Sequence, residues 1–515
     1  MERRLEKAGN RLNSICVKGV SLLSLLFMCY LLPMSFFRTT DMSTGGGIGE
    51  IVRFDYDNFF LNIIALFLCL CLFYLVWRIV SRLELVHILM FLCAWVLLFG
   101  FGLVVSAKLQ PSEDSYIVTF FARQAARGDL SYYHEYFRFF PYQFGFVLYE
   151  EIVLRLCHLV MPRAPEGFSS LILQGLNVVY TAFSYFALVM FTGRAFKSEI
   201  VQKLTAALMF FCLPALFFVT FMYGNVPSFA CVCGALWAFA AYHDQGRWHQ
   251  GLLTVLLMAL AVMLKLNSLI VVVALLIVWL LKLFKKPDGK SAVLAVLLLV
   301  SVLVTADLPQ KLYEKRSGED FGDGIPKISW LAMGLHEGSS CSGWYNPTYT
   351  TTAYRLSEYD GEATAQVARD AISQRMKVFG ENLIECERFF GRKFLSQWNE
   401  PSYQGLWNNQ LRDHYSQPGL MYELLCSRYE KGVKTFSNLY QQFVFFGFTL
   451  GLLRILRRRD MLSALLPLTV LGGMLYHLLF EAKSQHSQGY FLLMIPVAAY
   501  GLVKLFEILR DSKTN

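Results

Sequence analysis

The stretch PSEDSYIVTFFARQAARGDLSYYHEYFRFFPYQFG, residues 111–145, decides how the rest of this sequence is interpreted. It is the first long polar segment after three strongly apolar runs, so we expect it to emerge at a membrane surface. It opens with the acids Glu113 and Asp114 and continues as a helix-like piece to Arg127. Loops at the edge of a rigid scaffold often hold functional residues, so this segment is a candidate active-site loop.

The acid pair also has a simpler interpretation. Acids favour the N-terminus of a helix because they complement its macrodipole, and a helix is expected to start near Ser115. From these residues alone, a catalytic carboxylate and a helix cap both stay open.

The composition indicates a membrane protein that crosses the bilayer many times. Of the 515 residues, 55% are apolar and 15% aromatic, and the mean hydropathy is +0.43, which excludes a soluble protein of this length. The net charge of +9 does not indicate a nucleic-acid partner, because the basic residues cluster beside apolar runs as topology signals do. The lipid bilayer is therefore an expected partner and nucleic acid is not.

The cysteines form no recognisable metal-binding or disulfide framework. Most of the twelve lie in or beside apolar segments. Only Cys341, Cys386 and Cys426 fall in a polar loop, and they lack the regular spacing of a zinc site. One bridge among these three stays open, and no metal site is expected.

A bilayer crossing needs about 20 apolar residues, and about twelve such runs are present. We place them near residues 17–37, 59–79, 84–106, 168–192, 201–220, 226–242, 249–265, 267–284, 290–308, 437–456, 461–480 and 488–508. The N-terminal residues have the charge order of a signal peptide, but no small-residue cleavage site follows them. The first run is therefore expected to be a retained helix.

Basic residues between the runs predict the orientation. Under this count, one side of the membrane receives the clusters that begin at Arg3, Arg78, Arg194, Lys285 and Arg454. The positive-inside rule makes this side cytoplasmic, so both termini are expected inside the cell.

Residues 141–160 test this count, because they are long enough to be mistaken for another span. They carry Glu150, Glu151 and Arg155 centrally, and each such residue costs on the order of 2.5–3.5 kcal/mol at mid-bilayer. Counting them as a span would also reverse the charge rule downstream. We therefore predict an interfacial or re-entrant helix on the outer face.

The segment 309–436 is too long for a connector and has too little continuous apolar sequence to span, so we expect a mostly helical extracytoplasmic cap. The predicted fold is an all-α polytopic membrane protein with interfacial helices in its first long outer loop. Its parts are a two-helix membrane unit (1–83), a transmembrane core (84–308) with the catalytic outer loop 107–167, the cap (309–436) and the C-terminal helices (437–515).

Three strings in the cap carry a family resemblance: PKISWLAMGL at 326–335, GWYN at 343–346 and QWNEP at 397–401. With the stretch at 111–145 and the string FEAKSQHSQGY at 480–490, they resemble the C-fold membrane glycosyltransferases related to protein O-mannosyltransferases. The resemblance covers roughly residues 107–500. It departs from the family pattern at His486, where relatives often have Tyr.

The resemblance implies an inverting glycosyltransferase that uses a polyprenyl-phosphate-linked sugar and needs no metal or other cofactor. A carboxylate must take the proton of the acceptor, and cations must hold the leaving phosphate. Asp114 is expected to be the base, Glu113 a supporting acid and Lys483 the main phosphate cation. The other expected substrate-binding residues are Gln485, His486, Arg123, Tyr142, Gln143, Lys265, Trp344, Tyr345, Asn346, Lys393, Trp398 and Glu400.

These residues also have structural interpretations. Tryptophans can anchor a cap at the membrane interface. Lys483 can snorkel from a helix end to lipid headgroups, and Lys265 can simply belong to a turn between two runs.

For the whole chain, the alternative function is a transporter, flippase or polymerase of lipid-linked glycans, which would place charged residues inside its spans. The runs here are nearly free of such residues, which favours an enzyme that works at the surface. Its acceptor is expected to be a cell-envelope glycan, a lipid-linked glycan or a protein. The style of the loop motifs is typical of a bacterial plasma membrane.

Overall fold

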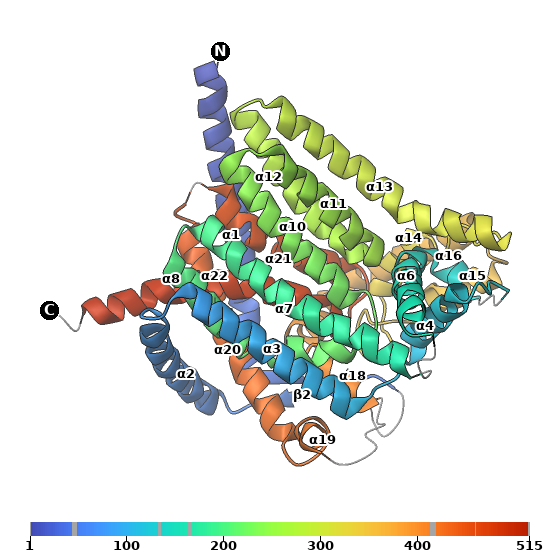
Figure 1. Ribbon diagram of the computed structural model, residues 1–515, viewed down its shortest axis with the longest axis horizontal. Coiled ribbons are helices and arrows are strands. Elements are labelled where there is room, and N and C mark those ends of the chain that lie inside the picture. Colours follow the sequence, from blue (N-terminus) through green and yellow to red (C-terminus); the bar gives the residue numbers. More distant parts are fainter. Residues whose placement is uncertain are drawn as a thin grey trace.

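The chain is a bundle of long helices with shorter helices gathered at one end (Figure 1). The computed structural model of the 515 residues describes 2–43, 49–131, 135–162, 167–411, 419–458 and 460–512. Residues 132–134, inside the stretch quoted first, lie outside the described residues. The mostly helical class expected from the sequence is confirmed.

The bundle is built from the long helices and the short turns that interrupt them. These are α1 (Glu2–Phe37), α2 (Phe59–Val80), α3 (Leu85–Ala107), α7 (Phe168–Phe196), α8 (Glu199–Phe210), α9 (Leu213–Phe217), η2 (Phe218–Thr220), α10 (Asn225–Gln245), α11 (Trp248–Leu264), η3 (Leu266–Ser268), α12 (Leu269–Lys285), α13 (Gly289–Ser317), α20 (Glu430–Ile455), α21 (Met461–Leu479) and α22 (Ser484–Asp511).

The remaining elements belong to the loops. The first loop forms the strands β1 (Arg38–Ser43) and β2 (Ile51–Tyr56). The stretch quoted first and its continuation form α4 (Glu113–Ala126), α5 (Tyr136–Phe139), η1 (Pro141–Gln143) and α6 (Phe144–Val160). The cap contains α14 (Lys327–Gly334), η4 (Pro347–Tyr349), α15 (Thr351–Leu356), α16 (Gly361–Glu381), α17 (Leu383–Trp398), α18 (Gly405–Leu411) and α19 (Leu420–Leu425).

Nine helical segments of the described chain are long and apolar enough to cross a membrane. They are α1, α2, α3, α7, α10, η3 with α12, α13, α21 and α22. The pair formed by α8 and α9–η2, bent by 55° at a short break, would make a tenth. The class of polytopic membrane protein is thus confirmed, whereas the count of about twelve spans stays a prediction.

Two of the expected runs form helices that are not among the segments long and apolar enough to cross a membrane. α11 has 17 residues, which is about one turn less than a full crossing. α20 carries Asn438, Gln441 and Gln442 in its first half, and all three are buried in the bundle. Gln442 donates a hydrogen bond to the carbonyl of Ser35 at 2.8 Å, so these polar groups tie α20 to its neighbours instead of facing lipid.

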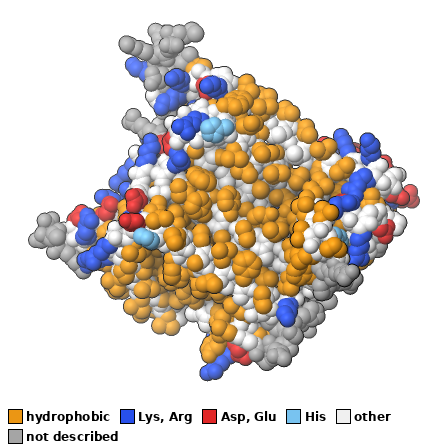
Figure 2. Space-filling model, viewed as in Figure 1, with side chains coloured by type: hydrophobic (Ala, Val, Ile, Leu, Met, Phe, Trp, Pro, Cys, Tyr) orange, Lys and Arg blue, Asp and Glu red, His pale blue; other side chains and the backbone are white. Residues whose placement is uncertain are grey.

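The two ends of the bundle differ. Figure 1 shows both termini at one end and α4, α6, α14, α15 and α16 at the other. Figure 2 shows a broad apolar belt between them, with charged side chains gathered toward the ends. Lys197, Lys285 and Arg458, from three of the basic clusters, line one cavity. These clusters therefore share an end, and that this end is cytoplasmic stays a prediction.

Helix α6 lies at this end of the bundle, beside α4 (Figure 1). Its Glu151 is buried and accepts hydrogen bonds from the guanidinium of Arg316 at 2.8 and 2.9 Å, and from Arg155 at 2.8 Å. These contacts fasten α6 to the end of α13. Because α13 continues to Ser317, the cap begins later than the predicted boundary at residue 309.

The expectation of an all-α fold is wrong in one place, because Arg38–Ser43 and Ile51–Tyr56 form a two-stranded antiparallel sheet, which we call the hairpin. Arg38 pairs with Tyr56 and Ser43 with Ile51 in an antiparallel register. The N–H of Thr40 donates to the carbonyl of the cap residue Asn399 at 3.1 Å. β-Branched and aromatic residues on either side of a glycine-rich segment are typical of a hairpin.

The cap packs directly onto the spans. Trp398, at the end of α17, is fully buried, and its ring centroid lies 6.0 Å from that of Tyr490 in α22. Neither Cys341 nor Cys386 forms a disulfide, so the bridge left open among Cys341, Cys386 and Cys426 is not formed.

Candidate active site

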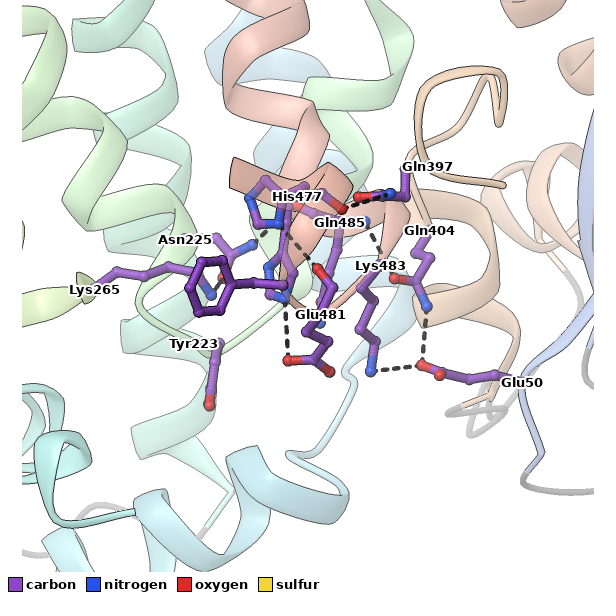
Figure 3. Close-up of polar contacts among 12 residues, drawn as sticks. Glu50, Tyr223, Asn225, Lys265, Gln397, Gln404, His477, Glu481, Lys483 and Gln485 are labelled. Carbon is purple, nitrogen blue, oxygen red and sulfur yellow. Dashed lines mark hydrogen bonds and ion pairs between the residues drawn. The ribbon is translucent and has the colours of Figure 1, made fainter. Parts of the chain in front are cut away.

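The segment between α21 and α22 presents a carboxylate and an ammonium group on one face. Ala482 is fully buried, and its N–H donates to the carbonyl of Gly343, in the GWYN turn, at 2.8 Å. Side chains alternate in direction along an extended chain, so Glu481 and Lys483 both point away from the side that buries Ala482. Figure 3 shows these two side chains next to each other.

Lys483 is positioned by a carboxylate from the hairpin. Its Nζ lies 2.7 Å from Oε1 of Glu50, which also accepts a hydrogen bond from Nε2 of Gln404 at 2.9 Å. Gln404 in turn accepts one from the N–H of Gln485 at 3.2 Å. Burial acts to lower the pKa of Lys483, but Glu50 and Glu481 outweigh it and hold that pKa above its usual value. Lys483 is therefore a permanent cation.

A second lysine approaches from the turn between α11 and α12. Nζ of Lys265 donates to Oδ1 of Asn225 at 2.7 Å and lies 4.8 Å from the ring centroid of Tyr223. Nδ2 of Asn225 donates to the carbonyl of Gln485 at 3.4 Å. A Cβ on Gly224 would lie 2.1 Å from the carbonyl oxygen of the residue before Lys265, so a larger residue would push these turns apart.

The charge of Lys265 depends on its surroundings. Burial lowers the pKa of Lys265 to about 7, although the negative charges of Glu481 and Asp114 act in the opposite direction. An additional anion beside it would raise this pKa, because an opposite charge favours the protonated form. An anionic ligand in contact with Lys265 would therefore favour the protonated, positively charged form of this side chain.

Asp114 stands in the first turn of α4, and other residues cap that helix. The N–H of Ser112 donates to Oγ of Ser115 at 3.1 Å, and this hydroxyl donates back to the carbonyl of Ser112 at 2.8 Å. The Asp114 side chain is exposed to solvent. Capping of α4 therefore does not need the Asp114 carboxylate, which weakens the simpler interpretation of this acid.

The charges around Asp114 place it near both lysines. Desolvation raises the pKa of Asp114, and the charge of Lys483 opposes this shift. Glu481 and Glu50 raise the pKa further, while Lys265 lowers it. Asp114 is therefore electrostatically coupled to both lysines, and this coupling weakens as the separation between charges grows. The Asp114 side chain is thus reached by water, while neighbouring protein atoms also desolvate it.

Tyr142 belongs to the same surface. Its side chain is 38% exposed, yet burial, followed by Tyr223, Glu481 and Asp114, raises the pKa of Tyr142 well above its usual value. The neighbouring Gln143 is buried and donates from Nε2 to the hydroxyl of Tyr223. We use the name "the recess" for this set of residues: Glu50, Asp114, Tyr142, Tyr223, Lys265, Glu481 and Lys483.

The recess combines carboxylates and ammonium groups in unequal number. The three carboxylates belong to Glu50, Asp114 and Glu481, and the two ammonium groups belong to Lys265 and Lys483. Such a set can accept a proton at one point while it balances an anion at another. Among the described residues, no group of three or more His, Cys, Asp or Glu side chains is arranged to hold a metal ion.

Two predicted carbohydrate-binding tryptophans are corrected to structural roles. Trp344 and Trp398 are 1% and 0% exposed, so neither has a ring face to offer a sugar. Nε1 of Trp344 donates to Oγ of Ser396 at 2.8 Å, which joins the GWYN turn to α17.

Glu400 and Lys393 are also buried and engaged within the protein. The Glu400 carboxylate accepts hydrogen bonds from the N–H of Ser402 at 2.9 Å and from Oγ of Ser484 at 3.1 Å, at the start of α22. The ammonium of Lys393 donates to the carbonyl of Phe480 at 2.7 Å and to that of Gly334. Both residues support the segment that carries Lys483 and cannot themselves touch a ligand in this arrangement.

Three other predicted residues bind neighbours outside the recess. Arg123 donates to Oγ of Ser170 at 2.7 Å and so ties α4 to α7. The hydroxyl of Tyr345 lies 3.1 Å from Oγ1 of Thr351 within the cap. Nδ2 of Asn346 donates to a cap carbonyl at 2.9 Å. The structure does not join these three to Asp114 and Lys483.

Glu113, Gln485 and His486 lie at the edges of the recess. Glu113 begins α4 with a φ of 49° and is exposed. Nε2 of His486 lies 3.9 Å from Oε2 of Glu481. Gln485 and His486 line a cavity of about 70 Å³ that also includes Lys265. This cavity is too small for a sugar and has room only for water molecules.

The sequence patterns do not single out Glu50, and they give no role to Glu481. Glu481 stood in the quoted string 480–490, and its spacing of two residues from Lys483 was the available signal. Glu50 follows a glycine-rich segment in the loop between the first two spans, and only recognition of the hairpin would have drawn attention to it. Figure 3 shows Glu50 on one side of Glu481 and Lys483, with Tyr223 and Lys265 on the other.

Comparison with known proteins gives a family but no activity. No curated protein matches the chain. A family model described as a conserved hypothetical integral membrane protein matches residues 185–498, which include Lys265, Glu481 and Lys483 but not Glu50 or Asp114. Because this match spans more than half of the 515 residues, the chain belongs to that family of conserved hypothetical integral membrane proteins.

Proposed function

We propose that the protein is an inverting membrane glycosyltransferase that moves a sugar from a polyprenyl-phosphate donor to an acceptor. The observation that carries this proposal is that the charge of Asp114 is coupled to those of Lys265 and Lys483, and these residues come from three distant parts of the sequence. A carboxylate that accepts a proton and cations that receive a phosphate are the two groups that the reaction needs.

In the proposed step, an acceptor hydroxyl attacks the anomeric carbon while Asp114 takes its proton. The bond between that carbon and the phosphate oxygen breaks, and its electron pair leaves with polyprenyl phosphate. The phosphate gains negative charge in this step, so Lys483 and Lys265 stabilise the transition state more than the bound donor. Asp114 and the lysines act on opposite sides of the sugar.

The perturbed groups suit these roles. The raised pKa of Asp114 makes its carboxylate a stronger base than an ordinary aspartate. Lys483 is already paired with Glu50, so it is held in place before the donor arrives. A donor phosphate would have to share Lys483 with Glu50, and protonation of Lys265 would offset the added negative charge.

The proposal includes a location. The basic clusters lie at the end of the bundle opposite the recess, so the positive-inside rule puts the recess on the outer face of the plasma membrane, with both termini inside. Polyprenyl-phosphate donors are membrane-anchored, and Lys483 precedes the first residue of α22, where a headgroup phosphate would lie. A bacterial cell would supply both the donor and a cell-envelope acceptor.

Mass spectrometry of lipids extracted from the purified protein tests the donor class. We expect polyprenyl phosphate or its glycosylated form to co-purify with the wild type and with Lys377→Met, an exposed lysine in the cap. Lys483→Met should lose most of that lipid. Equal retention by both variants, or no polyprenyl lipid in any sample, would argue against the proposal.

A further inference from the structure

A second cavity lies at the end of the bundle that carries the basic clusters, away from the recess. It has a volume of about 470 Å³, within the range of roughly 300–1,000 Å³ that small-molecule sites occupy. Its charged lining consists of Lys197, Lys282, Lys285, Arg458 and Asp460. We use the name "the basic pocket" for this cavity.

The basic pocket is assembled from elements that are distant in sequence. Lys197 ends α7 in a left-handed conformation with a φ of 51°, Lys282 and Lys285 come from the last turn of α12, and Arg458 follows α20. The first helix closes one side through Asn10. A Cβ on the adjacent Gly9 would lie 2.5 Å from Cα of Lys285, so glycine is what lets α1 reach this wall.

The cations of the basic pocket are not neutralised by the protein. In the part of the chain that the structure describes, none of the four forms an ion pair with a carboxylate. Lys282 lies over the ring of Tyr242, 4.5 Å from its centroid, and Arg458 lies 4.7 Å from the centroid of Tyr500. Contacts with ring faces orient these cations and leave their N–H donors for another acceptor.

Asp460, the carboxylate in the lining, does not cancel the positive charge of the basic pocket. Asp460 caps α21 by accepting a hydrogen bond from the N–H of Leu462 at 3.3 Å. The nearby Asp244 is paired with Arg194 at 3.5 Å. Asp288, whose charge also acts on Lys282, lies outside the lining and caps α13 by accepting from the N–H of Ser291 at 3.3 Å. The lining itself holds four cations and one carboxylate, an excess of positive charge around a cavity that has room for more than water.

We propose that the basic pocket binds a phosphate group, either of an anionic phospholipid or of a soluble phosphorylated compound. Planar guanidinium and flexible ammonium groups from several directions are the recognition chemistry of phosphate. Val278, Leu281 and Met461 add an apolar portion to the lining, which suits the glycerol part of a headgroup. The proposal concerns binding alone, so it does not depend on glycosyl transfer in the recess.

Ligand binding to delipidated protein in detergent tests the proposal by native mass spectrometry and by the shift in unfolding temperature. The probes are phosphatidylglycerol, phosphatidylcholine as the neutral comparison, and glycerol 3-phosphate. We expect phosphatidylglycerol or glycerol 3-phosphate to bind and raise the unfolding temperature, and which one does so identifies the source of the phosphate.

The matched variants separate the basic pocket from general surface charge. Lys285→Met with Arg458→Met should weaken phosphate binding at least about tenfold. Lys286→Met with Arg457→Met changes the net charge equally at exposed neighbours outside the lining and should change binding little. If the double pocket variant fails to fold, Lys282→Met alone provides the same comparison. Equal losses in both sets, or no binding of either phosphate probe, would overturn the proposal.

Discussion

At the scale of single residues, the decisive feature is that three carboxylates and two lysines share the recess, and that the two lysines differ in their pKa. Lys483 is held as a cation by Glu50 and Glu481, whereas the pKa of Lys265 is lowered to about 7. A site of this kind has one fixed and one adjustable positive charge. The adjustable charge should leave a signature in the pH dependence of binding.

We expect Asp114→Asn to reduce turnover by about 100-fold or more, because it removes the base but keeps the side-chain shape. Donor affinity should stay near that of the wild type. The matched control is Asp129→Asn in the same loop, where the exposed carboxylate accepts hydrogen bonds from the N–H and the hydroxyl of Ser131. This variant should stay within a few-fold of wild-type activity. If the two variants had comparable activity, Asp114 would not be the base and would only stabilise the N-terminus of α4.

Donor affinity should fall as the pH rises through about 7, the pKa of Lys265. Below that pH Lys265 is protonated and attracts phosphate, and above it the free protein has lost this charge. Lys265→Arg should remove the dependence, because guanidinium stays charged throughout. The measurement is the donor Kd across this pH range, and a constant wild-type Kd would rule out phosphate contact by Lys265.

At the scale of elements, the short segment 480–483 is the part that other elements hold in place. The cap contributes Gly343, whose carbonyl accepts from the N–H of Ala482, and Lys393, which donates to the carbonyl of Phe480. The strings that carried the family resemblance therefore act here as a support behind the recess. Within these strings, Trp344, Trp398 and Glu400 are buried.

Lys393→Met should destabilise the cap, because it leaves the carbonyls of Gly334 and Phe480 without their donor. Each unsatisfied buried group costs about 1–3 kcal/mol. We expect a lower unfolding temperature than for Lys377→Met, which removes an exposed lysine from the neighbouring helix α16. If the two variants unfold at the same temperature, Lys393 does not support this segment.

At the scale of the whole molecule, the sequence predicts the apolar helices well and their tertiary partners poorly. Spans such as α12 and α13 follow from composition alone, since lipid requires long apolar helices. The carboxylate of Glu50 could not be assigned to Lys483, because the contact joins the first loop to the last helix and no periodicity encodes it. Trp398 looked like a surface aromatic for the same reason.

The predicted orientation can be tested by labelling single cysteines in intact cells with a membrane-impermeant thiol reagent, after replacement of the native cysteines. Ser131→Cys and Met161→Cys, both exposed and on either side of α6, should react from outside. Lys286→Cys, at the opposite end of the bundle, should react only after the membrane is opened. Labelling of Met161→Cys only after opening would make α6 a span and reverse the orientation of the chain after it.

The most direct test of the proposed function is a transfer assay with purified protein in lipid nanodiscs. A polyprenyl-phosphate hexose serves as donor and a cell-envelope fraction as acceptor, and release of polyprenyl phosphate is measured. Wild type and Lys377→Met should release polyprenyl phosphate at similar rates, and Lys483→Arg should keep part of this activity. Lys483→Met should release very little, with both its turnover and its donor affinity reduced. Release by Lys483→Met equal to that of the wild type would contradict the assignment of the recess as the site of phosphate departure.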